Sequence, residues 1–191
     1  AAAGVEGLWL NCNPSAGRKL FLKTGWRLAW GEPRSRDAGG LLHGPGAFQQ
    51  LLPGLHREAL DRGADFLFAG GVVPVLDLYC GNGASLAHWR RQGAPCLGVE
   101  SAGDAVECAT LNVPGAGVLR GSCRTRLPQV RVWWRQHGQP RAVAWVNPDR
   151  SGLEPEVAAA LAAELQPARL AYLSCSAGSL ARDLRHLTAA G

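Results

Sequence analysis

Residues 75–85 have the pattern of a ligand-binding turn between a strand and a helix. Their sequence, VLDLYCGNGAS, is an apolar stretch followed by two glycines one residue apart. Gly81 and Gly83 would let the backbone pass close to a ligand, and a helix that starts after them would offer unpaired N–H groups. A dinucleotide site needs a third glycine, in G-x-G-x-x-G, and this chain has Leu86 at that position. The turn therefore departs from the dinucleotide pattern.

Two acidic residues accompany this turn. Asp77 lies four residues before Gly81, which gives D-x-x-x-G-x-G, a pattern typical of S-adenosylmethionine sites. Glu100 ends the next apolar stretch, CLGVE, where a carboxylate can accept both hydroxyls of a ribose in either class of cofactor. We expect Asp77, Gly81, Gly83 and Glu100 to bind S-adenosylmethionine. The alternative is an ordinary tight turn between a strand and a helix.

Two later segments place reactive or polar side chains at the expected ends of strands. In YLSCSAGSLARD, Cys175 comes directly before a helix that begins near Ala177. The positive end of that helix favours the thiolate, and a thiolate can add to an electron-poor ring carbon. In WVNPDRSG, Asn147 ends another strand and is directed to the same crevice. On residue type alone, a small buried cysteine is the alternative at Cys175.

A basic and aromatic stretch lies between these segments. No acidic residue occurs between Cys108 and Asp149, whereas six arginines and the pair Trp133–Trp134 do. Such a combination predicts a surface for nucleic acid, and we expect Arg131 and Arg135 to contact RNA. The alternative is a solvated helix or hairpin whose tryptophans pack into the core.

The elements that must position these residues alternate along the chain after residue 45. We expect strands at 74–79, 96–100, 117–121, 141–146 and 169–174, and helices at 47–69, 85–92, 104–112, 155–165 and 179–187. Strands that alternate with helices predict a parallel sheet covered by helices. Before residue 45 we expect only short strands, at 7–12, 19–23 and 26–30. We therefore divide the chain into a β-rich segment, 1–45, and an α/β domain, 46–191.

Composition limits the class of protein. The chain has 191 residues, of which 47% are hydrophobic and 18% charged, which is typical of a globular domain and excludes a disordered one. No apolar run reaches the roughly 18 residues of a membrane helix, and no signal-peptide pattern is present. The six cysteines lie at least 12 residues apart and the histidines are scattered, so we expect reduced cysteines and no metal site. The absence of methionine indicates a processed chain or a fragment.

Taken in order, four motifs resemble those of one enzyme family. VLDLYCGNGA, GVESAGDAVECA, VNPDRSGL and YLSCSAGSLARDLRHL are similar to segments of the RNA uracil-carbon-5 methyltransferases, and LNCNPSAGR and GPGAFQQLLP are similar to the segment that precedes the family's domain. The resemblance implies an α/β fold, namely the Rossmann-like sheet of class I S-adenosylmethionine-dependent methyltransferases without its last strands. It also implies a cytoplasmic, monomeric enzyme that acts on RNA and has no membrane partner.

The resemblance also implies roles for individual residues. The residues that would line the S-adenosylmethionine site are Gln50, Tyr79, Glu100 and Asn147. Cys175 would attack carbon 6 of the uracil, and Arg150 would hold the RNA or the enolate oxygen. Asn147 is similar to the residue of the ribosomal branch, so 23S rRNA is favoured as the substrate over tRNA.

Several departures from the family pattern support a competing hypothesis. The chain has Leu52, Ala84 and Ser176 where many members have asparagine. The family's general base, a glutamate after the last helix, would lie beyond residue 191. The chain would then be a truncated or degenerate homologue that binds S-adenosylmethionine or RNA without turnover. A third hypothesis, an unrelated Rossmann oxidoreductase, predicts binding of a nicotinamide dinucleotide.

Overall fold

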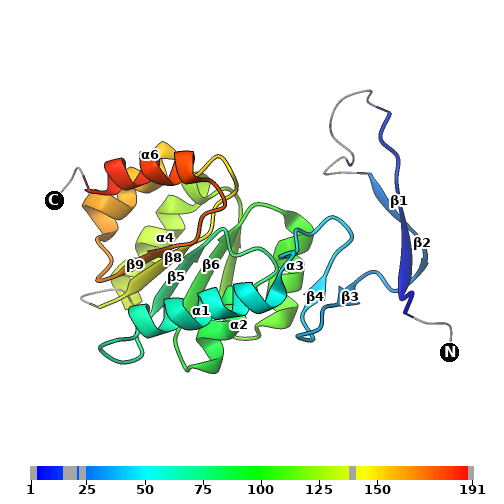
Figure 1. The fold of residues 1–191 in the computed structure, drawn as a ribbon, viewed down its shortest axis with the longest axis horizontal. Helices are drawn as coiled ribbons and strands as arrows, with labels where there is room; N and C mark the ends of the chain where they lie inside the picture. The colour runs from blue at the N-terminus through cyan, green and yellow to red at the C-terminus, as the bar shows by residue number, and fades with distance from the viewer. Residues whose placement is uncertain (1–3, 15–20, 22–24, 138–140, 189–191) are drawn as a thin grey trace.

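A computed structural model gives the architecture of residues 4–14, 21, 25–137 and 141–188. Five strands form its main sheet: β5 (Val75–Leu78), β6 (Cys96–Glu100), β7 (Gly117–Arg120), β8 (Val143–Val146) and β9 (Leu170–Tyr172). All four pairings are parallel, and the order across the sheet is β7-β6-β5-β8-β9 (Figure 1). From β5 the chain builds the sheet toward β7, and it then crosses back to add β8 on the other side of β5. The strand order therefore reverses between β5 and β8. Open α/β sheets bind ligands beside such a switch point, at the carboxyl ends of the strands.

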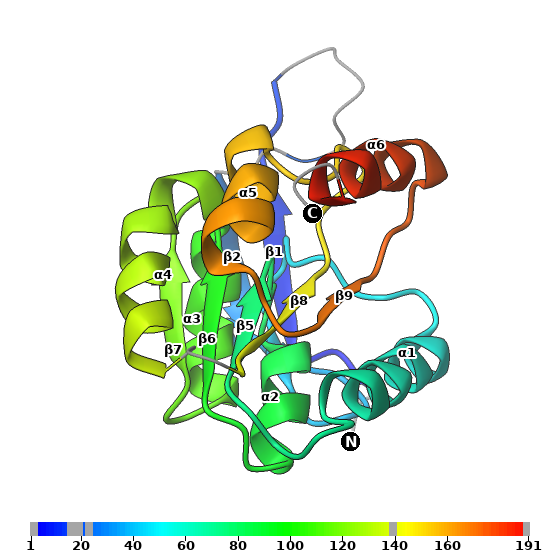
Figure 2. The same cartoon turned by 90° about the vertical axis from the view of Figure 1, so that its left-hand side faces the viewer.

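Helices cover both faces of this sheet (Figure 2). They are α1 (Pro53–Leu67), α2 (Ala84–Arg91), α3 (Gly103–Asn112), α4 (Cys123–His137), α5 (Pro155–Ala159) with a π-helical continuation (Ala160–Leu165), and α6 (Ala177–Thr188). Leu76 and Leu78 face a core cluster built with α4 and α5, and Val75 faces a second cluster built with α1 and α2. Because both faces are buried, the strands are nearly continuous apolar runs. The alternation of strands and helices expected after residue 45 is therefore confirmed.

The first part of the described chain consists of two small antiparallel ribbons. β1 (Gly7–Asn11) pairs with β2 (Trp26–Gly31), and β3 (Ser35–Arg36) pairs with β4 (Leu42–His43). The β1–β2 ribbon extends away from the main sheet beyond α3 (Figure 1). The strand expected at 19–23 falls outside the described residues apart from Phe21. The domain boundary near residue 45 stays a prediction.

The structure corrects one expectation about helices and decides between two alternatives for another segment. The helix expected from residue 47 begins at Pro53, because proline lacks an N–H group and is tolerated only in the first turn. The basic and aromatic stretch is helix α4, although Pro128 lies within it. Leu127, Val130 and Trp134 of α4 are buried, so its tryptophan side does pack into the core. Within the described ranges, no helix is long and apolar enough to cross a membrane.

Candidate functional site

The glycine-rich turn connects β5 to α2 through three residues with left-handed backbone conformations. The φ angles are 62° at Tyr79, 55° at Gly81 and 85° at Gly83. A Cβ atom at Gly83 would lie 3.1 Å from atoms of Ala109 and 3.2 Å from Val113, so this glycine allows α2 to approach the end of α3. A Cβ atom at Gly81 would have no neighbour within 4 Å. The turn is therefore packed on the side of Gly83 and open beside Gly81.

The Glu100 carboxylate is fixed next to this turn. Its Oε2 atom accepts a hydrogen bond from the Gly81 N–H at 3.1 Å, and its Oε1 atom accepts one from the Ala102 N–H at 2.8 Å. The Ser101 hydroxyl donates to Oε1 at 3.2 Å. Glu100 is half-buried at the carboxyl end of β6, as the sequence predicts. These bonds hold an acceptor at one side of the open region beside Gly81.

Asp77 has a different place from the one expected. Its side chain is fully buried, and its Oδ2 atom accepts a hydrogen bond from the indole N–H of Trp89 at 2.9 Å. Burial raises the pKa of Asp77 to about 7, although hydrogen bonds from Ser85 and Trp89 partly offset this. Trp89 in turn packs against Trp145 with ring centroids 5.3 Å apart. Asp77 therefore anchors α2 from within the core, and its expected contact with a cofactor stays a prediction.

Tyr79 links the turn to the segment after β8. Its hydroxyl lies 3.5 Å from both the backbone nitrogen and the Oε2 atom of Glu154. Burial, followed by the nearby Cys123 thiol, raises the pKa of Tyr79 well above its usual range, so the hydroxyl stays protonated. The Asn147 N–H donates to the Leu78 carbonyl at 3.3 Å and extends the β5–β8 pairing by one bond. These bonds bring the ends of β5 and β8 together.

The segment after β8 carries two of the expected site residues. Asn147 is half-buried, and Arg150 is exposed three residues later. The Asp149 carboxylate, next to Arg150, accepts a hydrogen bond from the Ser151 N–H at 2.8 Å, which closes a local turn. The segment therefore presents Asn147 at the switch point and Arg150 to solvent.

Cys175 lies in the short loop between β9 and α6. It is exposed, and the serines on both sides of it are half-buried. The Ser176 N–H donates to the Ser174 hydroxyl at 3.1 Å, and the Ser176 hydroxyl accepts from the Ser179 N–H at 3.4 Å. Ser176 thus caps the start of α6. The thiol is held at the carboxyl edge of the sheet, where the sequence predicts it.

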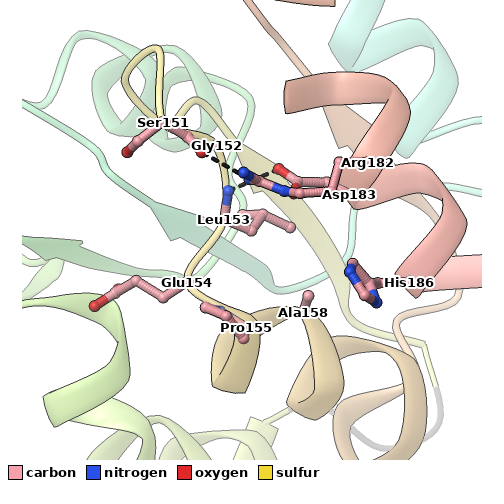
Figure 3. Close-up of a pocket in the computed structure, with 9 residues that line it drawn as sticks. All are labelled: Ser151, Gly152, Leu153, Glu154, Pro155, Ala158, Arg182, Asp183 and His186. Carbon is pink, nitrogen blue, oxygen red and sulfur yellow. Dashed lines mark hydrogen bonds and ion pairs between the residues drawn. The ribbon is translucent and has the colours of Figure 1, made fainter. Parts of the chain in front are cut away.

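Asp183 is a residue that the sequence analysis assigned no role. It is 1% exposed, and its Oδ2 atom accepts hydrogen bonds from the Leu153 N–H at 2.7 Å and the Tyr172 hydroxyl at 2.8 Å. Its Oδ1 atom accepts a hydrogen bond from the Arg182 guanidinium at 2.7 Å. The same guanidinium donates to the Ser151 carbonyl at 2.6 Å (Figure 3). Burial raises the pKa of Asp183, but these hydrogen bonds outweigh it and hold the pKa below its usual value. Asp183 therefore ties α6 to β9 and to the segment after β8.

A signal for Asp183 exists in the sequence. Leu180 and Leu187 lie three residues before it and four residues after it, so a charged residue occupies the apolar face of an amphipathic helix. Gly152 is also explained, because a Cβ atom there would collide with Asp183 and Arg182. Beside this network lies a cavity of about 360 Å³ between the segment after β8 and α6 (Figure 3). It is lined by Ser151, Gly152, Leu153, Glu154, Pro155, Ala158, Arg182, Asp183 and His186.

Arg131 and Arg135, the two arginines expected to contact RNA, lie on α4. The Arg131 guanidinium is bound by both oxygens of Glu164, at 2.6 Å and 2.9 Å. Helix α4 starts after β7 and returns toward the amino ends of the strands (Figure 2), and Arg131 and Arg135 belong to its second half. The ion pair with Glu164 competes with a phosphate for the Arg131 guanidinium, and the contact of Arg131 with RNA stays a prediction. Arg135 is exposed, and its contact with RNA stays a prediction.

Gln50 lies in the segment that leads into α1. It is half-buried, whereas Phe48, Leu51 and Leu52 around it are 80%, 93% and 65% exposed. Gln50 is therefore less exposed than its apolar neighbours in the sequence. Its predicted contact with a cofactor stays a prediction.

No model of a known protein family matches the chain. Among curated proteins, it is 29% identical over 196 residues to an uncharacterized RNA methyltransferase of Halalkalibacterium halodurans, which covers 98% of this chain and 41% of that protein. It is 34% identical over 135 residues to an uncharacterized RNA methyltransferase of Gloeobacter violaceus, which covers 68% of this chain and 27% of that protein. The chain thus spans about two fifths or less of the length of these relatives.

One solved structure is similar to nearly the whole chain. The tRNA (uracil-54, C5)-methyltransferase of Pyrococcus abyssi, in complex with S-adenosyl-L-homocysteine, superposes with a TM-score of 0.71 at 22% identity. The match covers 97% of this chain and 45% of that one. The expected fold, the Rossmann-like sheet of a class I methyltransferase, is confirmed.

Proposed function

We propose that this chain is the cofactor-binding and catalytic part of an RNA methyltransferase that transfers a methyl group from S-adenosylmethionine to carbon 5 of a uracil. The observation that carries the proposal is that one edge of the sheet presents an open glycine turn, the fixed Glu100 carboxylate and the exposed Cys175 thiol. Similarity to proteins named RNA methyltransferases supports RNA as the substrate.

The residues around the turn fit the proposed cofactor. The space beside Gly81 would admit a ligand against the backbone, and a side chain at this position would fill it. Glu100 would accept the two ribose hydroxyls, while Gln50, Tyr79 and Asn147 would line the rest of the site. S-adenosylmethionine supplies an electrophilic methyl group when it is bound. Asp77 would support the site from within the core, because it holds α2, whose first N–H groups face the turn.

The chemistry proposed for Cys175 starts with its addition to the ring. The thiolate forms a bond to carbon 6, and the electron pair of the carbon 5–carbon 6 double bond moves toward the carbon 4 oxygen as an enolate. Arg150 would hold the RNA or this oxygen. Carbon 5 then takes the methyl group, a base removes the carbon 5 proton, and the electron pair of that bond restores the double bond as the thiolate leaves.

A uracil in structured RNA must leave its stack before the thiol can reach carbon 6, because the ring face is otherwise covered. We propose 23S rRNA as the substrate, on the basis of Asn147, and expect a monomeric, cytoplasmic enzyme. The tRNA alternative is tested by offering both RNAs to the same protein.

A covalent complex with RNA that contains 5-fluorouracil tests the mechanism. Fluorine replaces the proton that must leave, so the bond between Cys175 and carbon 6 persists and is visible on a denaturing gel. We expect an adduct with the wild-type protein and none with Cys175→Ser. Cys12→Ser is the matched control, because Cys12 is the other exposed cysteine among the described residues.

The outcomes separate the competing hypotheses. Equal adduct in Cys175→Ser would refute the mechanism. Binding of S-adenosylhomocysteine without any adduct would support a non-catalytic homologue. Binding of only a nicotinamide dinucleotide would replace the proposal by an oxidoreductase.

A further inference from the structure

We propose that Asn112 is a positioning residue for the cofactor turn, and that it couples the backbone of Leu42 to that turn. This inference rests on the proposed binding of S-adenosylmethionine. Asn112 is the last residue of α3, lies 30 positions from the turn in the sequence, and belongs to none of the motifs considered so far.

The evidence is a set of hydrogen bonds made by one side-chain amide. The Asn112 Oδ1 atom accepts from the Leu42 N–H at 2.8 Å. Its Nδ2 group donates to the Leu42 carbonyl at 2.9 Å and to the Asn82 carbonyl at 2.9 Å. The Asn82 side chain donates to the same Leu42 carbonyl at 3.1 Å. The amide of Asn112 therefore satisfies both backbone groups of Leu42 and a backbone group inside the turn.

The position of Asn82 gives these bonds their functional meaning. Asn82 lies between Gly81 and Gly83, two residues that have no side chain to restrict their backbone. The bond from Asn112 to the Asn82 carbonyl fixes the peptide group between Asn82 and Gly83, on the packed side of the turn. The open side at Gly81 is left to the ligand. A turn fixed in this way loses less conformational entropy when a ligand binds.

The segment that contains Leu42 is itself anchored to α3. The Arg34 guanidinium lies 2.6 Å from a carboxylate oxygen of Glu107. Gly44 is buried, and a Cβ atom there would lie 2.9 Å from the Asp104 carboxylate. Displacement of this segment would therefore remove partners of Asn112 and release the turn.

The first experiment measures the affinity of the 191-residue chain for S-adenosylhomocysteine by titration calorimetry. We expect Asn112→Ala to lower the affinity roughly tenfold, since it removes three hydrogen bonds around the turn. Asn112→Asp keeps an acceptor for the Leu42 N–H but places its other carboxylate oxygen against two carbonyls, and we expect an equal or larger loss. Thr110→Ala is the matched control: Thr110 is exposed and belongs to the same helical turn, and its hydroxyl donates to the Val106 carbonyl of its own helix.

The second experiment needs no variant and therefore does not depend on how the variants fold. Amide hydrogen exchange of the wild-type chain is measured by NMR with and without S-adenosylhomocysteine. We expect the ligand to slow exchange at the Leu42 N–H, which Asn112 connects to the turn. The Leu41 N–H, which donates to Asp37 at 2.9 Å within its own loop, should not change and serves as the reference amide.

The outcomes distinguish this inference from the function on which it rests. No binding of S-adenosylhomocysteine by the wild-type chain would overturn the proposed function and this inference together. Wild-type binding combined with unchanged affinity in both Asn112 variants would overturn the inference alone. So would a lowered melting temperature with unchanged affinity, because that is the result expected of a residue that only stabilises the fold.

Discussion

The turn after β5 and the loops after β8 and β9 are held in place in different ways. The turn depends on its own glycines, on the hydrogen bond that the Gly81 N–H donates to Glu100, and on the one that Asn112 donates to the Asn82 carbonyl. The two loops depend on Asp183, a single buried carboxylate that binds the Leu153 N–H, the Tyr172 hydroxyl and Arg182 at once. Damage to the turn should therefore affect cofactor binding first. Damage to Asp183 should affect the placement of Cys175 and Arg150 first.

The largest effect is expected from Asp183→Ala. The Leu153 N–H and the Tyr172 hydroxyl would lose a buried acceptor, so the free energy of unfolding should fall by about 2–4 kcal/mol. If the two regions are independent, adduct formation with 5-fluorouracil RNA should be lost while the affinity for S-adenosylhomocysteine stays within about twofold. Urea denaturation and calorimetry measure the two effects. Glu156→Ala, which removes an exposed partner of Arg124, is the control.

A parallel loss of cofactor affinity in Asp183→Ala would contradict this separation. It would show that the network around Asp183 also supports the turn, by way of Leu153 and the adjacent Glu154, which contacts Tyr79.

The next effect compares two glycines of one turn. At Gly83, alanine would combine a φ of 85° with contacts of 3.1 Å to Ala109, and we expect a loss of about 2–3 kcal/mol in the free energy of unfolding. At Gly81 the φ of 55° alone should cost about 1 kcal/mol, since a Cβ atom there meets nothing. Gly81→Ala should nevertheless reduce the affinity for S-adenosylhomocysteine at least as strongly as Gly83→Ala, because its Cβ atom enters the open side. Thermal unfolding and calorimetry on both variants test this, and equal stability losses would refute the assignment of the two sides.

A smaller effect concerns pH. The contributions of the two buried acids, Asp77 and Asp183, to stability should change with pH in opposite directions. The pKa of Asp77 is raised to about 7, so the folded chain binds a proton that the unfolded chain releases above about pH 4. Its contribution to stability therefore falls as pH rises from about 4 to 7. The pKa of Asp183 is lowered, so its contribution is present above the pKa of the unfolded chain and is lost as pH falls through the folded value.

Asp77→Asn isolates the first of these contributions. The amide oxygen can still accept from Trp89, but the titration is gone, so urea midpoints should depend less on pH between 4 and 7 than they do in the wild-type chain. An unchanged pH dependence would mean that Asp77 does not titrate in that range.

The difference between the two regions also explains which residues could be predicted. Gly81, Gly83 and Glu100 belong to patterns that are short in sequence, and the parallel sheet brings the ends of β5 and β6 together without further information. Asp77 shares that pattern, but its side chain points to the α1–α2 face because strand residues alternate. Its burial could have been inferred from the apolar residues on both sides of it.

Asp183 and Asn112 could not be assigned in the same way. Their partners, such as Leu153 and Leu42, are 30 and 70 positions away and contribute backbone groups, which no residue type reveals. The start of α1 at Pro53 was predictable from proline chemistry, whereas the pairing of Arg131 with Glu164 required the packing of α4 against the helix after β8. Contacts that join distant backbone groups thus need the three-dimensional arrangement.

The smallest effect is expected where the sequence predicted an RNA contact. Arg131 is held by Glu164 at the surface, so Arg131→Ala should change neither RNA affinity nor adduct formation beyond experimental error. Arg150 is exposed on the segment that Asp183 fixes, and Arg150→Ala should weaken binding of 23S rRNA fragments and reduce the dependence of affinity on salt. Filter binding at two salt concentrations compares the variants. An equal loss of RNA affinity in Arg131→Ala and Arg150→Ala would mean that α4 belongs to the RNA-binding surface. RNA would then also contact the molecule away from the edge that carries Cys175.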